Sequence, residues 1–82
     1  MSPTKPSLSL QDCVRDNVET FFADLEDTEP AHLHDMLMRA VERPLLEVVM
    51  ARAQNNQSRA AQWLGLNRNT LRKKLVEHGL ID

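Results

Sequence analysis

The segment 56–78 constrains the fold of this chain more than any other part of the sequence. It reads as a short helix, a tight turn and a second, basic helix. Ala61 falls where two helices would cross closely, and Gly65 falls in the turn, where a positive φ favours glycine. Leucines on both sides of the turn can pin the second helix to the first. The pattern predicts a helix-turn-helix of the DNA-binding type, with a simple helical hairpin as the alternative.

The distribution of charge supports this interpretation. The chain as a whole is slightly acidic, with a formal net charge of −2. Residues 1–47 contain ten Asp or Glu and four Lys or Arg, whereas residues 48–76 contain six Lys or Arg and no acid. A phosphate backbone responds to such a local patch rather than to the charge of the whole chain. A solvated basic surface is the alternative, although ordinary exposed helices mix the two signs.

Composition limits the fold class and the compartment. A chain of 82 residues forms one small domain, and its 41% hydrophobic content with only two glycines favours an all-α fold. Cys13 is the only cysteine, which excludes a disulfide within the chain and suits a reducing cytoplasm. No apolar run approaches the roughly 20 residues that a membrane span needs. We therefore expect a cytoplasmic protein without membrane contact.

Hydrophobic periodicity predicts the first helix over about residues 10–26. The preceding residues 1–9 include two prolines and are expected to form a flexible tail. Ser9 offers an N-cap to the helix. The apolar side chains that follow recur at helical spacing on one face. They are Val14, Val18, Phe21 and Leu25.

A second, longer helix is predicted from about Pro30 to about Ala53. Pro30 fits the first turn, where its missing N–H has no helical partner to lose. Pro44 falls in the middle and removes one backbone hydrogen bond. Because the apolar phase continues through Pro44, one kinked helix is favoured over two separate helices. The apolar stripe consists of Leu33, Leu37, Val41, Leu45, Val48 and Val49, widened by Met36, Ala40 and Met50.

Capping residues delimit the last two helices. Asn55 suits the C-cap of the second helix, and Asn56 suits the N-cap of a third helix that reaches the turn. Asn67 caps a fourth helix over about residues 68–78, and Gly79 closes it.

The predicted organisation is a helical dimerisation core over residues 10–53 and a helix-turn-helix DNA-binding region over residues 54–82. The first two helices carry more apolar surface than they can cover by pairing with each other. Burial against a second copy of the chain is the simplest solution. A two-fold homodimer also suits DNA, because paired half-sites meet paired recognition helices.

Three stretches carry a family resemblance, namely residues 44–50, 56–61 and 64–75. They closely resemble the bacterial nucleoid protein family Fis, the factor for inversion stimulation, over about residues 10–81. The resemblance implies a four-helix protomer, an intertwined homodimer and low-stringency binding to double-stranded DNA with marked bending. It also implies roles in transcription regulation and nucleoid organisation. The same helix-turn-helix ends many enhancer-binding activators, so such a C-terminal domain is an alternative.

The resemblance is incomplete at both ends of the chain. The best-known member of the family has a β-hairpin arm ahead of its first helix that activates DNA invertases, and only residues 1–9 precede the first helix here. Contact with a recombinase or with RNA polymerase therefore stays open. Glu77 and His78 stand at positions that are often basic in the family, which predicts weaker contact with the DNA backbone there.

The resemblance assigns DNA contacts to the starts of the third and fourth helices. Asn56, Ser58 and Arg59 match residues that hold phosphates. Asn67 matches the start of the recognition helix, where it serves as a cap that can also touch phosphate. Asn69 stands where a small glycine often occurs, and it either adds or blocks a contact.

The fourth helix carries the remaining candidates. Arg68 lies near its N-terminus, the part that reaches base edges in the major groove, and arginine suits a bidentate contact with guanine. Thr70 and Arg72 can reach the DNA backbone, and Lys73 and Lys74 are expected to clamp phosphates. A solvated surface side chain is the alternative for each of these residues.

Other residues fit structural roles better than chemical ones. Trp63 is expected to anchor the third helix against the second rather than stack on a base. His32 and His34 point to different helix faces without cysteine partners, so no metal site is expected. No phosphate-binding glycine loop or catalytic set can be assembled, so we expect neither a cofactor nor enzymatic activity. A helical adaptor module that binds protein is the alternative from another functional class.

Overall fold

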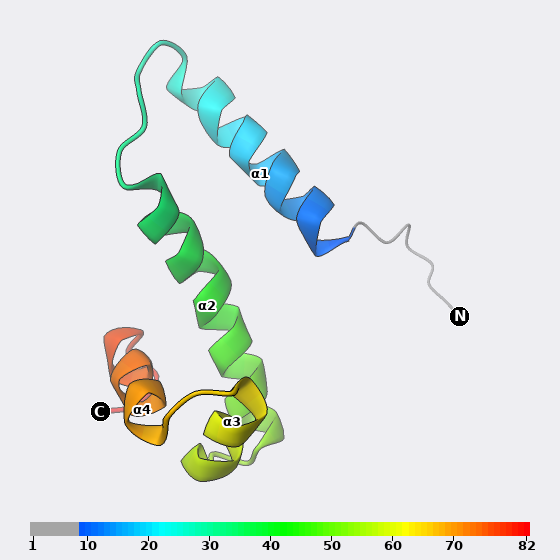
Figure 1. Ribbon diagram of the computed structural model, residues 1–82. Helices are drawn as coiled ribbons and strands as arrows, with labels where there is room; N and C mark the ends of the chain where they lie inside the picture. Colours follow the sequence, from blue (N-terminus) through cyan, green and yellow to red (C-terminus); the bar gives the residue numbers. More distant parts are fainter. Residues whose placement is uncertain (1–8) are drawn as a thin grey trace. The chain divides into compact units, whose positions relative to one another are not determined.

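The computed structural model describes residues 9–82, which form four α-helices without any strand (Figure 1). The helices are α1 (Leu10–Leu25), α2 (Leu33–Arg52), α3 (Gln57–Leu64) and α4 (Arg68–Glu77). The prediction of an all-α, four-helix chain is confirmed. Most of the predicted N-terminal tail, residues 1–8, lies outside the described residues. The chain divides into two compact units, one ending at His32 and the other spanning residues 33–82, and each is described by itself.

The α1 helix begins as its sequence predicts. Ser9 has an extended backbone, with φ −65° and ψ 162°, and its hydroxyl accepts a hydrogen bond from the Asp12 amide at 3.1 Å. Capping of this kind satisfies an amide that has no partner within the helix. No residue of α1 is buried, and Phe22 is 45% exposed. The apolar face of α1 is therefore incompletely covered within its own unit.

The α2 helix runs without interruption through Pro44. The prediction of one helix rather than two is confirmed, because the helical assignment continues on both sides of the proline. The predicted start is wrong: Pro30 precedes the helix, which begins at Leu33. The physical reason is His32, whose φ of +57° is left-handed and cannot continue a right-handed helix toward Pro30.

A short left-handed joint connects α2 to α3. Gln54 and Asn55 have φ angles of +56° and +62°. The Gln54 amide donates to the Ala51 carbonyl at 3.1 Å, and the Asn55 amide donates to the Met50 carbonyl at 2.9 Å. This pattern satisfies the last carbonyl groups of α2 in the manner of a Schellman motif. The predicted C-cap at Asn55 lies too late in the chain: α2 ends at Arg52, and Gln54 takes the first left-handed position, with Asn55 after it.

The turn between α3 and α4 depends on Gly65. Its φ of +74° places it in the left-handed region that glycine adopts without a steric penalty. The Gly65 amide donates to the Gln62 carbonyl at 3.2 Å, and the Leu66 amide donates to the Ala61 carbonyl at 2.9 Å. The turn therefore ends α3 and sends the chain back into α4, as the sequence predicts.

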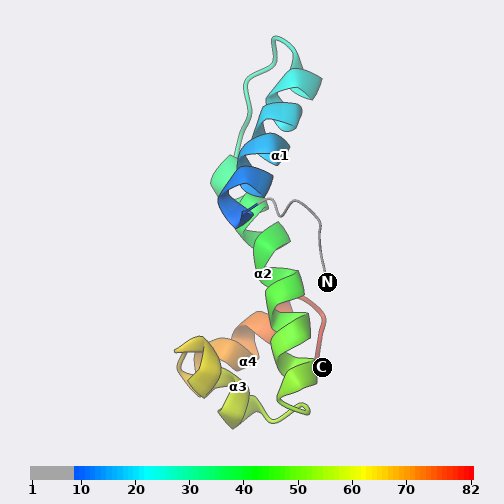
Figure 2. The same cartoon turned by 90° about the vertical axis from the view of Figure 1, so that its right-hand side faces the viewer.

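The core of residues 33–82 lies where three helices meet. Figures 1 and 2 show α3 and α4 beside the C-terminal part of α2. The two alanines of α3 allow a close approach, since Ala60 is fully buried and Ala61 is only 4% exposed. The leucines of α4 that complete the core are fully buried. The core consists of Leu46, Met50, Ala53, Ala60, Ala61, Leu71 and Leu75.

The predicted apolar stripe of α2 turns out to be two surfaces. Leu46, which the predicted stripe omits, is only 1% exposed and faces the core of its own chain. Leu45 and Val48, which the stripe includes, are 47% and 60% exposed. One side of α2 therefore packs on α3 and α4, and the other side leaves apolar groups in solvent. No helix within residues 9–82 is long and apolar enough to cross a membrane.

Candidate nucleic-acid interface

Two asparagines fix the starts of α3 and α4. The Asn56 side-chain oxygen accepts a hydrogen bond from the Arg59 amide at 3.0 Å. The Asn67 side-chain oxygen accepts one from the Asn69 amide at 2.7 Å. Both predicted N-caps are confirmed. Each cap leaves other N-terminal amides free, and the positive end of a helix dipole favours a nearby anion such as phosphate.

The predicted contact residues form one largely exposed set. Three lie at the start of α3, and the others follow along α4 and its cap. Nine of the ten are exposed to solvent, and Lys74 is half-buried. The exposed nine are Asn56, Ser58, Arg59, Asn67, Arg68, Asn69, Thr70, Arg72 and Lys73.

Four cations of this set are free of carboxylate partners. Within residues 9–82, no ion pair involves Arg59, Arg68, Arg72 or Lys73. A phosphate could therefore approach these side chains without displacing an acid. Their positive charge is uncompensated by close contacts, which is the local condition for attracting a polyanion.

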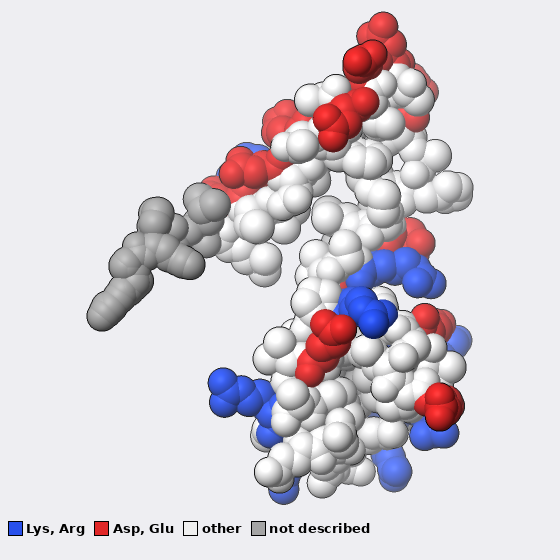
Figure 3. Space-filling model, turned by 180° about the vertical axis from the view of Figure 1, so that it is seen from behind, with Lys and Arg blue, Asp and Glu red and all other residues white. Residues whose placement is uncertain are grey.

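The two compact units differ in charge. Figure 3 shows one face of the chain, on which acidic side chains dominate the unit that contains α1. Lys and Arg are spread over the face of the unit that contains α2, α3 and α4, among fewer acids. The basic character of the candidate interface is therefore a property of the helix-turn-helix end of the chain.

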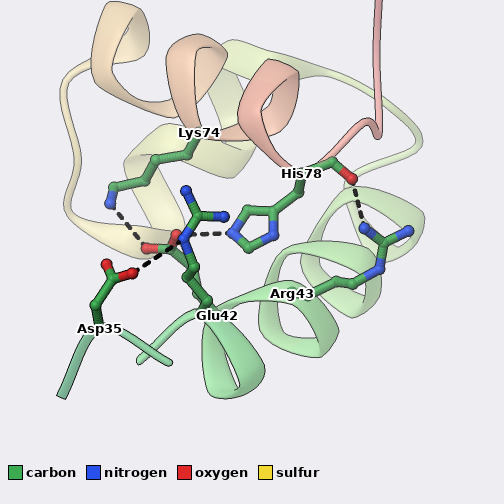
Figure 4. Close-up of polar contacts among 6 residues, drawn as sticks. Asp35, Glu42, Arg43, Lys74 and His78 are labelled. Atoms are coloured by element: carbon green, nitrogen blue, oxygen red, sulfur yellow. Dashed lines mark hydrogen bonds and ion pairs between the residues drawn. The ribbon is translucent and has the colours of Figure 1, made fainter. Parts of the chain in front are cut away.

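Glu42 of α2 holds the side chain of Lys74 in α4 and that of His78, the C-cap residue of α4 (Figure 4). Its Oε2 accepts a hydrogen bond from the Lys74 ammonium at 2.8 Å, and its Oε1 lies 2.9 Å from Nε2 of His78. The His78 side chain is only 6% exposed. Arg43, the next residue of α2, donates a hydrogen bond from its guanidinium to the His78 carbonyl.

These contacts change the chemistry of the Glu42 carboxyl. The hydrogen bond from Lys74 and then that from His78 lower the pKa of Glu42, while partial burial acts in the opposite direction. Sequence reasoning missed this cluster, because its members lie far apart along the chain. A signal was present: Glu42 lies one turn before Leu46, so it extends the inward side of α2 that continues to Met50 and Ala53.

The Trp63 side chain does not occupy the helix interface that the sequence predicts for it. Trp63 is 56% exposed, so the prediction that it anchors α3 against α2 is wrong. The small Ala60 and Ala61 fill that interface instead, which leaves the indole on the outer side of α3.

Lys74 lies within the predicted region but is paired with Glu42, and its predicted phosphate contact stays a prediction. No group of three or more His, Cys, Asp or Glu side chains within residues 9–82 is placed to hold a metal ion.

A match to a known protein family establishes the family to which the chain belongs. The family model described as "Bacterial regulatory protein, Fis family" matches residues 37–78, which include most of α2 and all of α3 and α4. The chain belongs to the Fis family. The matched residues contain the whole predicted contact set and the Glu42 cluster, so both lie within the part of the chain that matches the family model. The description of the family as regulatory agrees with the prediction that the chain is not an enzyme.

Similar proteins extend the match beyond the family model. A protein of Ralstonia nicotianae is 54% identical over 72 residues, which cover 88% of this chain and 94% of the relative. Proteins of Neisseria meningitidis serogroups A and B are each 52% identical over 81 residues, which cover 99% of this chain and all of the relative. Each relative is named, provisionally, a Fis-like DNA-binding protein. The similarity therefore includes α1 as well as the helix-turn-helix.

The lowered pKa of Glu42 predicts a dependence of stability on acid pH. Because the carboxyl is more acidic in the folded than in the unfolded chain, its contribution is complete above the unfolded value of 4.5. That contribution disappears as the pH falls through the lower, folded value. The Glu42→Gln variant lacks this contribution. Between about pH 6 and about pH 3, its free energy of unfolding should therefore decrease less than that of the original chain.

Urea unfolding at a fixed protein concentration, followed by helical circular dichroism, measures the effect. The difference in unfolding free energy between the two proteins should be largest near neutral pH and should shrink in acid. A difference that stays constant across the range would show that the Glu42 carboxylate does not stabilise the fold.

Proposed function

We propose that this Fis-family chain is a DNA-binding regulator that binds double-stranded DNA through α3 and α4. The observation that carries the proposal is a set of four exposed cations, at the start of α3 and along α4, that have no carboxylate partner within residues 9–82. Capped helix starts beside these cations suit phosphate, and an exposed basic helix suits the major groove. The provisional naming of the relatives as DNA-binding proteins agrees with this function.

The proposed roles divide the contact set into two classes. Arg68 reads base edges, because the N-terminal end of a recognition helix reaches the floor of the major groove. Arg59, Arg72 and Lys73 hold phosphates, and the polar side chains around them set the register. Low sequence stringency follows from this division, because phosphate contacts outnumber the single clear candidate for base reading.

A homodimer is the second part of the proposal. The incompletely covered face of α1 and the exposed Leu45 and Val48 on α2 support it. A small chain stabilises itself by removing such surfaces from water, and a second copy supplies a matching apolar surface. Two copies would also present two recognition helices to two half-sites.

DNA bending and chromosomal roles complete the proposal. Successive major grooves lie about 34 Å apart on one face of straight DNA. In each protomer α4 follows α2 through two short connections, so a compact dimer would hold its recognition helices closer than this spacing. The duplex would then bend toward the protein and narrow its central minor groove. Such a bend suits a regulator of transcription and of nucleoid organisation, acting in the cytoplasm at many sites.

The division of roles between Arg68 and Lys73 is testable with paired variants. Arg68→Ala should weaken binding to a preferred site by about 1–3 kcal/mol and should flatten the preference among sites. Lys73→Ala should weaken all sites about equally and reduce the salt slope by roughly one unit. Arg15→Ala, on the exposed surface of α1, is the matched control and should leave binding unchanged. Fluorescence anisotropy against random competitor DNA makes the measurement, and identical behaviour of the two α4 variants would refute the division.

The dimer is testable at Val48. Val48→Asp would place an unpaired charge in the proposed apolar interface, at a cost of several kcal/mol. We expect dissociation or unfolding at micromolar concentration in analytical ultracentrifugation. Val76→Asp, the same change at an exposed site on α4, is the control and should leave the dimer intact. A folded monomer of the original chain at that concentration would contradict the proposal.

Bending is testable with the DNA rather than with the protein. Central base pairs of a good site are changed from A·T to G·C while both flanks are kept. Bending costs on the order of 1–6 kcal/mol and is cheapest in a flexible, A·T-rich centre, so affinity should fall. A circular-permutation gel reports the bend. Equal affinity for both sites together with an unbent duplex would leave an ordinary helix-turn-helix dimer.

A further inference from the structure

We infer that Glu42 positions α4 for DNA by holding Lys74 and His78, and that Lys74 stays on this carboxylate instead of binding a phosphate. The inference rests on the proposed DNA-binding function and deepens it. It separates Lys74 from the neighbouring cations of α4, to which the sequence alone assigns the same role.

The geometry makes Glu42 a clamp on one turn of α4. Its two oxygens bind separate side chains, Lys74 at 2.8 Å and His78 at 2.9 Å. Lys74 and His78 lie one helical turn apart, so they project from the same side of α4. The hydrogen bond from Arg43 to the His78 carbonyl adds a third tie at the C-terminal end of the helix (Figure 4). The three bonds join α4 and its C-cap to two consecutive residues of α2, Glu42 and Arg43, and they oppose both rotation and sliding of α4.

Burial distinguishes this pair from the other ion pairs of the chain. The side chains of Lys74 and Glu42 are 31% and 28% exposed, whereas those of Arg43 and Glu47 are 49% and 48% exposed. Exposed pairs are screened by water and salt, and partly buried pairs are screened less. Among the Lys and Arg ion pairs within residues 9–82, Lys74–Glu42 is therefore the one best protected from replacement by solvent.

Competition with DNA favours retention of the pair. To reach a phosphate, the Lys74 ammonium would have to leave Glu42, and this partly buried carboxylate would then lie beside the DNA with His78 as its remaining partner. Arg72 and Lys73 carry no such cost, because no carboxylate within residues 9–82 pairs with them. The nearby cations can neutralise phosphates while Lys74 keeps α4 in place.

Orientation of α4 matters more for base reading than for phosphate binding. A bidentate contact from Arg68 requires a fixed approach to the base edge, whereas phosphates accept cations from many directions. Loosening α4 should therefore lower the preference for good sites more than it lowers the affinity for random DNA. Removal of the Glu42 charge also removes a repulsion toward phosphate, which acts on all sequences alike.

The first experiment compares Glu42→Gln with Glu47→Gln in the full chain. Both changes remove one carboxylate from α2. Only the first removes bonds to Lys74 and His78, because Glu47 pairs with Arg43 and with neither of those two side chains. The probes are a duplex selected for tight binding by the original chain and a random duplex of equal length. The ratio of the two affinities should fall on the order of fivefold or more in Glu42→Gln, as expected for partial loss of a base contact. The ratio should be unchanged in Glu47→Gln, and an unchanged ratio in both variants would overturn the inference.

The second experiment separates a clamp from a phosphate contact. Lys73→Ala should reduce the salt slope of binding by roughly one unit, because it removes a neutralised phosphate. Lys74→Ala should keep the original slope but lower the affinity ratio, and Lys74→Arg should restore the ratio by keeping the pair with Glu42. A slope reduced equally by Lys73→Ala and Lys74→Ala would overturn the inference and assign Lys74 to a phosphate.

Controls keep failure of the fold and failure of the function apart. Helical circular dichroism verifies folding, and if Glu42→Gln unfolds, the Lys74→Ala and Lys74→Arg pair decides the question. If the original chain binds neither duplex, the proposed function fails. Amide hydrogen exchange still tests the clamp in that case: protection of α4 should fall in Glu42→Gln but not in Glu47→Gln. Equal protection of α4 in the two variants would overturn the positioning role.

Discussion

Close packing of α3 against its neighbours is the constraint on which the rest of the structure depends. Ala60 and Ala61 are buried together with Leu46 of α2 and the two inner leucines of α4. Side chains this small let three helices approach with little space between them, and any larger residue would force them apart. The exposed faces of α3 and α4, and hence the predicted DNA contacts, are set by this packing.

Local features could be predicted from the sequence, and contacts across the chain could not. The caps at Ser9, Asn56 and Asn67 and the turn at Gly65 depend on hydrogen bonds within a few residues, and all four predictions are confirmed. The Glu42 cluster joins residues that lie 32 and 36 positions apart along the chain. Spacing along α2 can place Glu42 on the inward side of its helix, but it cannot identify Lys74 and His78 as the partners. The boundary between residues 53 and 54 stays a prediction, and in the structure α2 lies in one compact unit with α3 and α4.

The errors have physical causes that are specific to particular residues. Trp63 is large and apolar, which made an anchoring role attractive, but the alanines of α3 already fill the helix interface. Pro30 suits a helix start, but the left-handed His32 delays that start. The predicted stripe on α2 combined two different surfaces. Helical periodicity indicates that a face is apolar, but it does not indicate whether the same chain or another molecule covers that face.

The left-handed joint at Gln54 and Asn55 has a mechanical consequence. Two consecutive residues in this conformation, neither of them glycine, are held by hydrogen bonds to Ala51 and Met50. Such a joint has low compliance, because alternative backbone angles would break those bonds. The long helix α2 and the recognition helix α4 are therefore expected to move together as one rigid unit. If the protein engages two grooves that are too far apart, a joint of this kind does not extend to meet them, and the duplex has to bend instead.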